Sequence, residues 1–305
     1  MSRAGFPMML GVAVLAGAGV ATGQYVTAVG PEAVVETSSP PSTAPDGEIA
    51  ELVDIGGGRT LYLECAGGGS PMILLEAGDE SGVEEWQPVF AALAAETRTC
   101  AYDRAGVGRS VEATGCRAVD ELLGDLEALL DAAELAGPYV LVGTSGGGFL
   151  MAGFAARHPD DVAGLVLLET PRASAFSRLP PEVRAAIACD SPSNIEHRDY
   201  IAVEHDIWDA RAEIGEFPMT IISNDYGPDA PPGDQANVVD QQTWLVLSPD
   251  SNQVVVPSGH DVVWNESALV IDEILAVVAE ARGPIEPIRL GDIGGRGLPT
   301  STRQA

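Results

Sequence analysis

The chain has 305 residues, of which 46% are hydrophobic, and its formal net charge at pH 7 is −29. This length accommodates one α/β domain of about 200–250 residues together with additional segments. The strong negative charge argues against nucleic acid or an anionic membrane surface as a partner, because both require clustered positive charge.

The first residues have the features of an export signal. Arg3 provides positive charge, residues 4–21 carry no charged side chain, and small residues such as Ala16 and Ala18 resemble a cleavage site. We interpret residues 1–23 as a signal peptide or as an uncleaved N-terminal membrane anchor, since the stretch approaches the length of a membrane span. Residues 24–47, rich in Pro, Ser and Thr, are expected to form a linker. These features predict a secreted or extracytoplasmic membrane-anchored protein.

Strands and helices alternate from residue 48 onward. Eight strands are expected, at 50–55, 59–65, 71–76, 97–102, 139–143, 162–168, 217–223 and 253–256. Helices are expected at 83–95, 118–135, from Ser145 to about His158, 235–247 and 267–281. This alternation predicts an α/β fold with a mostly parallel, buried eight-stranded sheet and helices on both faces.

One segment, residues 171–216, breaks this alternation. It contains two expected helices, at about 181–188 and 194–214, and no strand. Inserted between strands of the sheet, it would lie over the strand ends as a helical lid. We therefore assign residues 48–170 and 217–282 to the core, 171–216 to the lid, and 283–305 to a disordered tail.

The strongest motif is Gly143-Thr144-Ser145-Gly146-Gly147, between an apolar β-branched run and an Ala-rich stretch. A strand that turns sharply into a helix strains the residue at the apex, and the flanking glycines allow close packing. Ser145 would then stand at the carboxyl edge of the sheet, beside N–H groups that favour negative charge. The motif predicts a nucleophile, with a glycine-rich turn of no catalytic role as the alternative.

A serine hydroxyl needs a base, and the base needs a carboxylate to orient it. His260 is the predicted base, because it follows the last strand in a glycine-containing loop. The other three histidines are interpreted as helix-end or surface residues: His158, His197 and His205.

The supporting acid should lie between Ser145 and His260 in the chain. Glu169 directly follows an apolar strand, where a charge is costly unless it is paired, and it is our first candidate. Asp225 and Asp229, just past the strand 217–223, are the alternatives.

An oxyanion in acyl transfer needs two hydrogen-bond donors. We expect the N–H of Gly146 to be one donor. The second should come from the loop after the strand 71–76, either from Gly78 or from its neighbour Asp79.

Three motifs resemble the α/β-hydrolase-fold serine hydrolases: Gly143–Gly147, the turn Tyr102-Asp103-Arg104-Ala105-Gly106-Val107-Gly108-Arg109-Ser110, and Ser258-Gly259-His260. The resemblance covers about residues 48–282, interrupted by the lid. It implies the α/β-hydrolase fold, a triad of Ser145, His260 and an acid, an acyl-enzyme, and a small-molecule acyl substrate.

The chain departs from the family pattern around the motif. Thr144 replaces the usual His before the nucleophile, and Gly146 replaces the usual bulky residue after it. Glu76 and Ala77 replace the family's His-Gly. Because Thr144 and Gly146 make this turn less bulky than usual, we expect a roomier pocket beside Ser145.

Four cysteines, Cys65, Cys100, Cys116 and Cys189, lack the spacing of metal ligands, and we expect neither a metal nor a cofactor. Export makes disulfides permissible, with three possible pairings. The family topology, which places the second and fourth strands side by side, implies the pair Cys65–Cys100. Cys116 would then pair with Cys189 and staple the lid near the site.

The sequence thus predicts an exported serine hydrolase that acts on an ester or related acyl bond. A peptidase, a lactonase or a thioesterase of the same fold is an alternative. A non-catalytic binding protein of this fold is the rival from another class.

Overall fold

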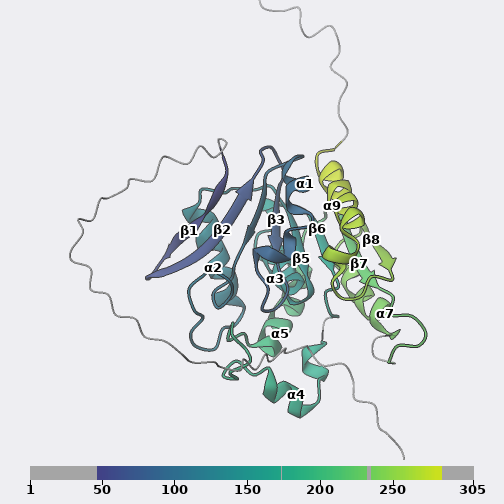
Figure 1. Ribbon diagram of the computed structural model, residues 1–305. Coiled ribbons are helices and arrows are strands. Elements are labelled where there is room, and N and C mark those ends of the chain that lie inside the picture. Colours follow the sequence, from purple (N-terminus) through teal and green to yellow (C-terminus); the bar gives the residue numbers. More distant parts are fainter. Residues whose placement is uncertain (1–46, 173, 232–234, 284–305) are drawn as a thin grey trace, which may run out of the picture. The chain divides into compact units, whose positions relative to one another are not determined.

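An eight-stranded sheet forms the centre of the computed structural model, which describes residues 47–172, 174–231 and 235–283 (Figure 1). The strands are β1 (Ile49–Gly56), β2 (Arg59–Ala66), β3 (Met72–Glu76), β4 (Thr99–Tyr102), β5 (Tyr139–Thr144), β6 (Val162–Leu168), β7 (Met219–Asn224) and β8 (Ser251–Val256). Their spatial order is β1-β2-β4-β3-β5-β6-β7-β8. β2 runs antiparallel to its two neighbours, β1 and β4. All other neighbouring pairs of described strands are parallel. The predicted mostly parallel sheet is confirmed.

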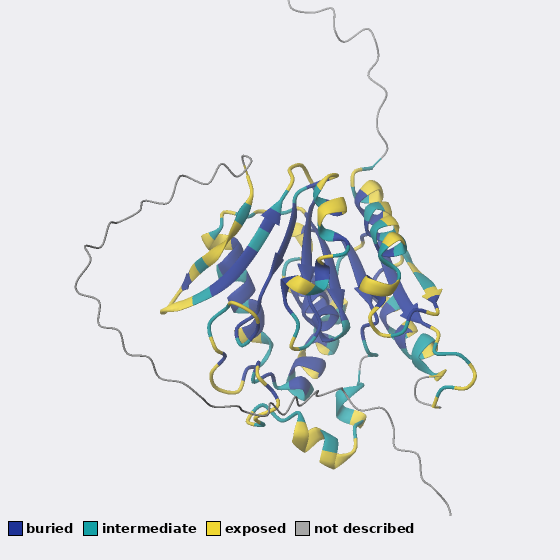
Figure 2. Cartoon of the chain, in the orientation of Figure 1, coloured by how far each residue is buried: buried dark blue, intermediate teal, exposed yellow. Residues whose placement is uncertain are grey.

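Helices cover both faces of this sheet. One apolar cluster joins the sheet to α2 (Val119–Ala132) and α3 (Ser145–Arg157), and a second joins it to α1 (Phe90–Ala94) and α9 (Ser267–Ala281). Leu74 belongs to the first cluster and Leu75 to the second, because successive side chains of a strand point to opposite faces. The central strands are therefore mostly apolar and buried, as Figure 2 shows in dark blue.

Several helices differ from the expected ranges. The expected helix 83–95 is a 3-10 turn (Val83–Trp86) followed by α1, because Pro88 has no N–H with which to continue a helix. The expected helix 235–247 divides into α7 (Asn237–Gln241) and a 3-10 turn (Gln242–Leu247). A short α8 (Val262–Asn265), which was not predicted, follows the loop that carries His260.

The insert, residues 171–216, contains α4 (Pro181–Ala186), α5 (Tyr200–Ala210) and two 3-10 turns, Phe176–Arg178 and Arg211–Glu213. The second helix was expected from residue 194 but begins at Tyr200. Residues 194–199, here called the strap, instead pair with Arg117, whose N–H donates to the carbonyl of His197 and whose carbonyl accepts from Asp199. Asp199 also caps α5 by accepting from the N–H of Ala202 (3.1 Å).

Two disulfides join segments that are distant in the sequence. Cys65–Cys100 links β2 to β4, and Cys116–Cys189 links the segment before α2 to the insert. These are the pairs that the family resemblance implied. The second bond ties the insert to the core beside the strap, and the function of the insert as a lid stays a prediction.

Three expected segments lie outside the described residues. They are the signal peptide or anchor (1–23), the linker (24–47) except Gly47, and the tail (283–305) except Gly283. In the part of the chain that the structure describes, no helix has the length and apolar character needed to cross a bilayer.

Candidate active site

The turn from β5 into α3 has the geometry expected of the glycine motif. Ser145 stands at the first position of α3 with φ of +46°, in the left-handed region that non-glycine residues rarely adopt. A Cβ at Gly147 would lie 2.3 Å from the carbonyl oxygen of Ala77, and one at Gly143 would lie 2.7 Å from the Cα of Gly148. Side chains at these positions would collide with backbone, which explains the two glycines.

His260 reaches Ser145 from the loop after β8. Its Nε2 lies 3.1 Å from the Oγ of Ser145, and its side chain is 54% exposed. Gly259, with φ of +76°, donates its N–H to the side-chain oxygen of Asn224 (2.7 Å), at the end of β7. This hydrogen bond fixes the loop to the carboxyl edge of the sheet.

Glu169, directly after β6, lies on the other side of His260. Its Oε2 is 3.5 Å from Nδ1 of His260, and its side chain is 2% exposed. Four groups donate to this carboxylate: the N–H of Asn224 (2.5 Å), Asn237 (3.0 Å), the hydroxyl of Tyr226 (3.1 Å) and Gln241 (3.2 Å). The buried charge is thereby satisfied, as a carboxylate at the end of an apolar strand requires.

The alternative acids lie elsewhere. Asp225 and Asp229 are exposed, and Asp225 accepts from the N–H of Gly227 (2.9 Å). No hydrogen bond between described residues joins either aspartate to His260. The geometry therefore favours Glu169 over Asp225.

The hydrogen bond with Glu169 raises the pKa of His260 above its ordinary value of 6.5. Desolvation opposes this shift, and the negative charges of Glu169, Asp261 and Glu85 add to it. Because only the neutral imidazole accepts a proton, a raised pKa restricts the basic form of His260 to higher pH.

The donors next to Ser145 differ in part from those expected. Gly146 is the second residue of α3, so its N–H has no partner within the helix. The N–H of Gly78, however, donates to Oε2 of Glu85 (2.8 Å), so of the two expected candidates Gly78 is not available as the second oxyanion donor. Among the described residues, no hydrogen bond uses the N–H of Asp79, and it becomes the candidate for the second donor.

Arg104, from the Tyr102–Ser110 turn, fixes the loop after β3 (residues 77–80, the β3 loop). It donates to the carbonyls of Ala77 and Gly78, both at 2.7 Å. In a trans peptide the N–H of the next residue points away from the carbonyl. The N–H groups of Gly78 and Asp79 therefore both point away from Arg104.

Arg104 also pairs with two buried carboxylates. Glu76 accepts from its Nη1, and Glu196 of the strap accepts from its Nε (2.6 Å) and Nη2 (2.7 Å). Burial raises the pKa of Glu196, but the charge and hydrogen bonds of Arg104 outweigh it and hold the pKa at about 2. Glu196 further accepts from the N–H of Glu80 (2.8 Å), so the strap supports the β3 loop directly.

The space beside Gly146 is filled rather than open. Arg198 of the strap donates to Asp79 (2.6 Å) and to the carbonyl of Gly146 (3.1 Å). A Cβ at Gly146 would lie 2.1 Å from Oδ1 of Asp79. The expectation of a roomier pocket at this point was wrong, because the Asp79 carboxylate occupies the volume of the missing side chain.

The remaining histidines lie elsewhere. Nε2 of His158 lies 2.9 Å from Glu127, Nδ1 of His197 lies 2.7 Å from the carbonyl of Cys189, and His205 lies on α5. Of the described histidines, only His260 contacts Ser145.

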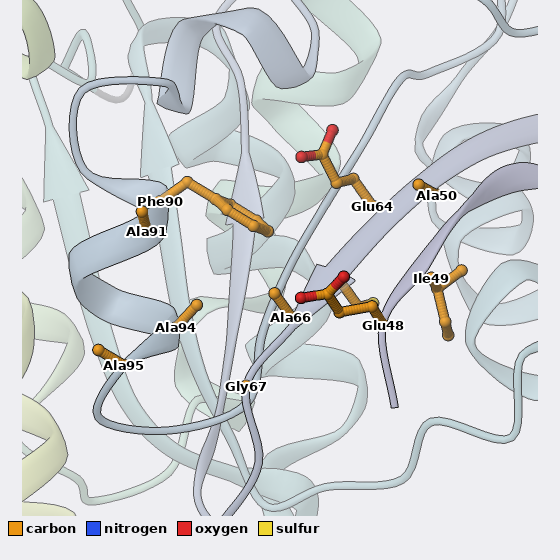
Figure 3. Close-up of a pocket in the computed structure, with 11 residues that line it drawn as sticks. Glu48, Ile49, Ala50, Glu64, Ala66, Gly67, Phe90, Ala91, Ala94 and Ala95 are labelled. Atoms are coloured by element: carbon orange, nitrogen blue, oxygen red, sulfur yellow. The ribbon is translucent and has the colours of Figure 1, made fainter. Parts of the chain in front are cut away.

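Two surface hollows lie apart from these residues. The one in Figure 3, about 420 Å³, lies among β1, β2 and α1, where Glu48, Glu64 and Phe90 line it with mostly small residues. The other, about 510 Å³, lies beside α2 near Arg59 and Asp125. Ser145, His260 and Glu169 line neither hollow, so neither one is part of the candidate site.

Residues 70–191 match the model of the alpha/beta hydrolase fold family. An uncharacterized protein, YqjL, of Bacillus subtilis is 27% identical over 154 residues, covering 50% of this chain and 61% of that protein. A putative carbamate hydrolase, RutD, of Azorhizobium caulinodans is 38% identical over 133 residues, covering 43% of this chain and 49% of that protein. The chain thus matches only about half to three-fifths of the length of these relatives.

Solved structures share the same fold. An enol-lactonase from Burkholderia xenovorans has a TM-score of 0.57 at 19% identity, covering 74% of this chain and 99% of that one. A thermophilic esterase from Thermogutta terrifontis has a TM-score of 0.56 at 21% identity, covering 77% and 98%. At these identities the likeness concerns the fold. Together with the family match over residues 70–191 and the sheet order, it shows that this chain has the α/β-hydrolase fold.

Proposed function

We propose that this protein is a serine hydrolase that cleaves an ester or a related acyl bond. The observation that carries the proposal is the 3.1 Å contact between Nε2 of His260 and Oγ of Ser145, with Glu169 on the opposite ring nitrogen. A nucleophile, a base and an orienting acid in this order are the elements of a Ser-His-acid triad.

In the proposed reaction, Oγ of Ser145 attacks the acyl carbonyl while His260 takes the hydroxyl proton. The N–H groups of Gly146 and Asp79 stabilise the negative charge on the carbonyl oxygen. His260 then gives its proton to the leaving alcohol, and an acyl-enzyme remains. Water, deprotonated by His260, attacks this ester and releases the acid, which returns Ser145 to its hydroxyl form.

Removing either end of the Ser145–His260 contact tests the proposal. We expect Ser145→Ala and His260→Ala to lower the kcat for p-nitrophenyl butyrate by at least about 10³-fold, because the triad acts as a unit. We also expect a fluorophosphonate probe to label the wild-type protein and not Ser145→Ala. Unchanged ester hydrolysis by Ser145→Ala would contradict the proposed mechanism.

Other reactions of the same triad stay open within this proposal. A peptidase, a lactonase or a thioesterase would use the same acyl-enzyme, and the solved enol-lactonase of the same fold is one reason to include lactones in a substrate panel. The rival from another class is a non-catalytic binding protein. It predicts a folded wild-type protein that neither reacts with the probe nor hydrolyses any acyl substrate.

We further propose that the protein acts outside the cytoplasm. The two disulfides support this location, because such bonds persist in oxidising compartments. Peptide mapping of exported protein under non-reducing conditions should recover both cross-linked pairs, and four free thiols would contradict the proposal.

A further inference from the structure

Glu85 connects the two segments that carry the candidate oxyanion donors. Its Oε1 accepts from the hydroxyl of Thr144 (2.6 Å), the residue directly before Ser145. Its Oε2 accepts from the N–H of Gly78 (2.8 Å), the residue directly before Asp79. One carboxylate therefore bridges the Ser145 turn and the β3 loop.

Glu85 and Arg104 hold the β3 loop from opposite directions. Arg104 binds the carbonyls of Ala77 and Gly78, whereas Glu85 binds the N–H of the peptide between them. Because a peptide unit is planar, the contacts of Glu85 and Arg104 fix the Ala77–Gly78 peptide. The contact of Arg104 with the Gly78 carbonyl fixes the next peptide, which carries the Asp79 N–H. A hypothetical Cβ on Gly78 would lie 3.4 Å from the Cβ of Ser145, so this peptide lies directly beside the nucleophile.

We propose that Glu85 is a positioning residue that holds the second oxyanion donor in register with Ser145, through Thr144. The inference rests on the proposed hydrolase function of the site. It also accounts for Thr144 at a position where the family usually has His, because a hydroxyl reaches the Glu85 carboxylate at 2.6 Å.

The charge of Glu85 has a second effect that a purely structural contact lacks. Its negative charge contributes to the raised pKa of His260. Removing the charge while keeping the contacts should therefore shift the pH dependence of catalysis. Removing the contacts should instead lower kcat.

Three variants separate these effects. In Glu85→Gln, the amide oxygen can accept from Gly78 and the amide nitrogen can donate to the Thr144 hydroxyl, so both contacts persist without the charge. We expect its kcat at the optimum pH to stay within about threefold of wild type, and the acidic limb of the kcat/KM profile to move to lower pH. Glu85→Ala loses both contacts, and Thr144→Val loses one of them with little change in shape.

For Glu85→Ala we expect kcat to fall roughly 10- to 100-fold with KM within about threefold, since a misplaced donor affects the transition state more than substrate binding. Thr144→Val should lose less. The kcat of the double variant Glu85→Ala/Thr144→Val should fall little below that of Glu85→Ala. The hydrogen bond that Thr144→Val removes, between Thr144 and Glu85, is already absent in Glu85→Ala. Binding of a boronic acid, whose adduct with Ser145 uses the same donors, should weaken in parallel with kcat/KM.

Glu84→Ala is the matched control. Glu84 is the exposed neighbour in the same 3-10 turn, and among the described residues its side chain accepts only from the N–H of Gly82 (3.2 Å). We expect wild-type kinetics from this variant. Probe titration of active sites and a thermal melt of each variant separate a kinetic defect from a folding defect.

The outcomes distinguish this inference from the proposed function. An active wild-type enzyme, together with a folded Glu85→Ala variant of unchanged kcat, overturns the positioning role alone. An unshifted pH profile in Glu85→Gln overturns its electrostatic part. A wild-type protein that neither hydrolyses p-nitrophenyl butyrate nor reacts with the probe overturns the proposed function and this inference with it.

Discussion

Glu169 and Asp225 differ by environment rather than by chemistry. Glu169 is buried with five groups directed at its carboxylate, His260 included, whereas Asp225 is exposed in its own turn. We expect Glu169→Gln to lower kcat on the order of 10²- to 10⁴-fold, because the amide neither fixes the His260 tautomer nor stabilises its cation. Asp225→Asn should retain wild-type activity. Comparable losses in both variants would contradict the assignment.

The Glu169→Gln substitution should also change the pH dependence of kcat/KM. The hydrogen bond with Glu169 is the largest cause of the raised His260 pKa. In the wild type, kcat/KM should fall as the pH drops through this raised pKa, above the ordinary 6.5. In Glu169→Gln the residual activity should decline only at lower pH. A profile of kcat/KM from pH 5 to 9 measures the shift.

At this scale the candidate residues that the sequence indicated are those with local signals. Ser145 lies in a glycine motif, His260 in a loop after the last strand, and Glu169 at the end of an apolar strand. The Asp79–Arg198 pair had no such signal, because 119 residues separate its partners and only the folded strap brings them together. The occupied space beside Gly146 was missed for the same reason.

The strap connects the insert to the candidate site. Glu196 and Arg198 contact the β3 loop and the carbonyl of Gly146, while the Cys116–Cys189 bond holds the preceding part of the insert to the core. The insert is therefore part of the support of the candidate site. The sequence predicted helix from residue 194, but backbone pairing with Arg117 competes with helix formation until Asp199 caps α5.

We therefore expect removal of this disulfide to affect both stability and catalysis. Cys116→Ser/Cys189→Ser should lose about 2–4 kcal/mol of unfolding free energy, because the bond closes a long loop. Its kcat should also fall, since the strap is less constrained. The control is Cys65→Ala/Cys100→Ala, within the sheet, which should lower the melting temperature and leave kcat of the folded enzyme unchanged. A Cys116→Ser/Cys189→Ser variant with wild-type melting temperature and kcat would contradict this role.

The strand pattern allowed the order of elements to be predicted well, because each central strand is a short apolar run bounded by turns. The helix boundaries were less predictable where side chains of other segments bind the backbone. The Val83–Trp86 turn is an example: the N–H of Val83 donates to Asp103, 20 residues away in the chain (2.8 Å). Such contacts exist only after the sheet has brought β3 and β4 together.

The charge of the whole molecule bears on which substrates reach Ser145. The chain carries −29, and the two cations near the site are buried, with Arg104 4% and Arg198 1% exposed. Asp79 is 17% exposed and Glu80 is exposed, so carboxylates rather than guanidinium groups face the solvent there. We therefore expect an anionic substrate to meet repulsion both at long range and beside Ser145.

We expect the enzyme to discriminate between mono-p-nitrophenyl adipate and its neutral methyl ester. At low ionic strength, kcat/KM should be roughly tenfold or more lower for the anion, and added salt should narrow the gap because it screens exposed charges. Asp79→Asn should narrow the gap at low salt as well, since it removes the partly exposed carboxylate that lies against Gly146. Equal kcat/KM for the two esters at low salt would show that the acidic surface does not select the substrate. The role of the Asp79 carboxylate would then be limited to its contact with Arg198.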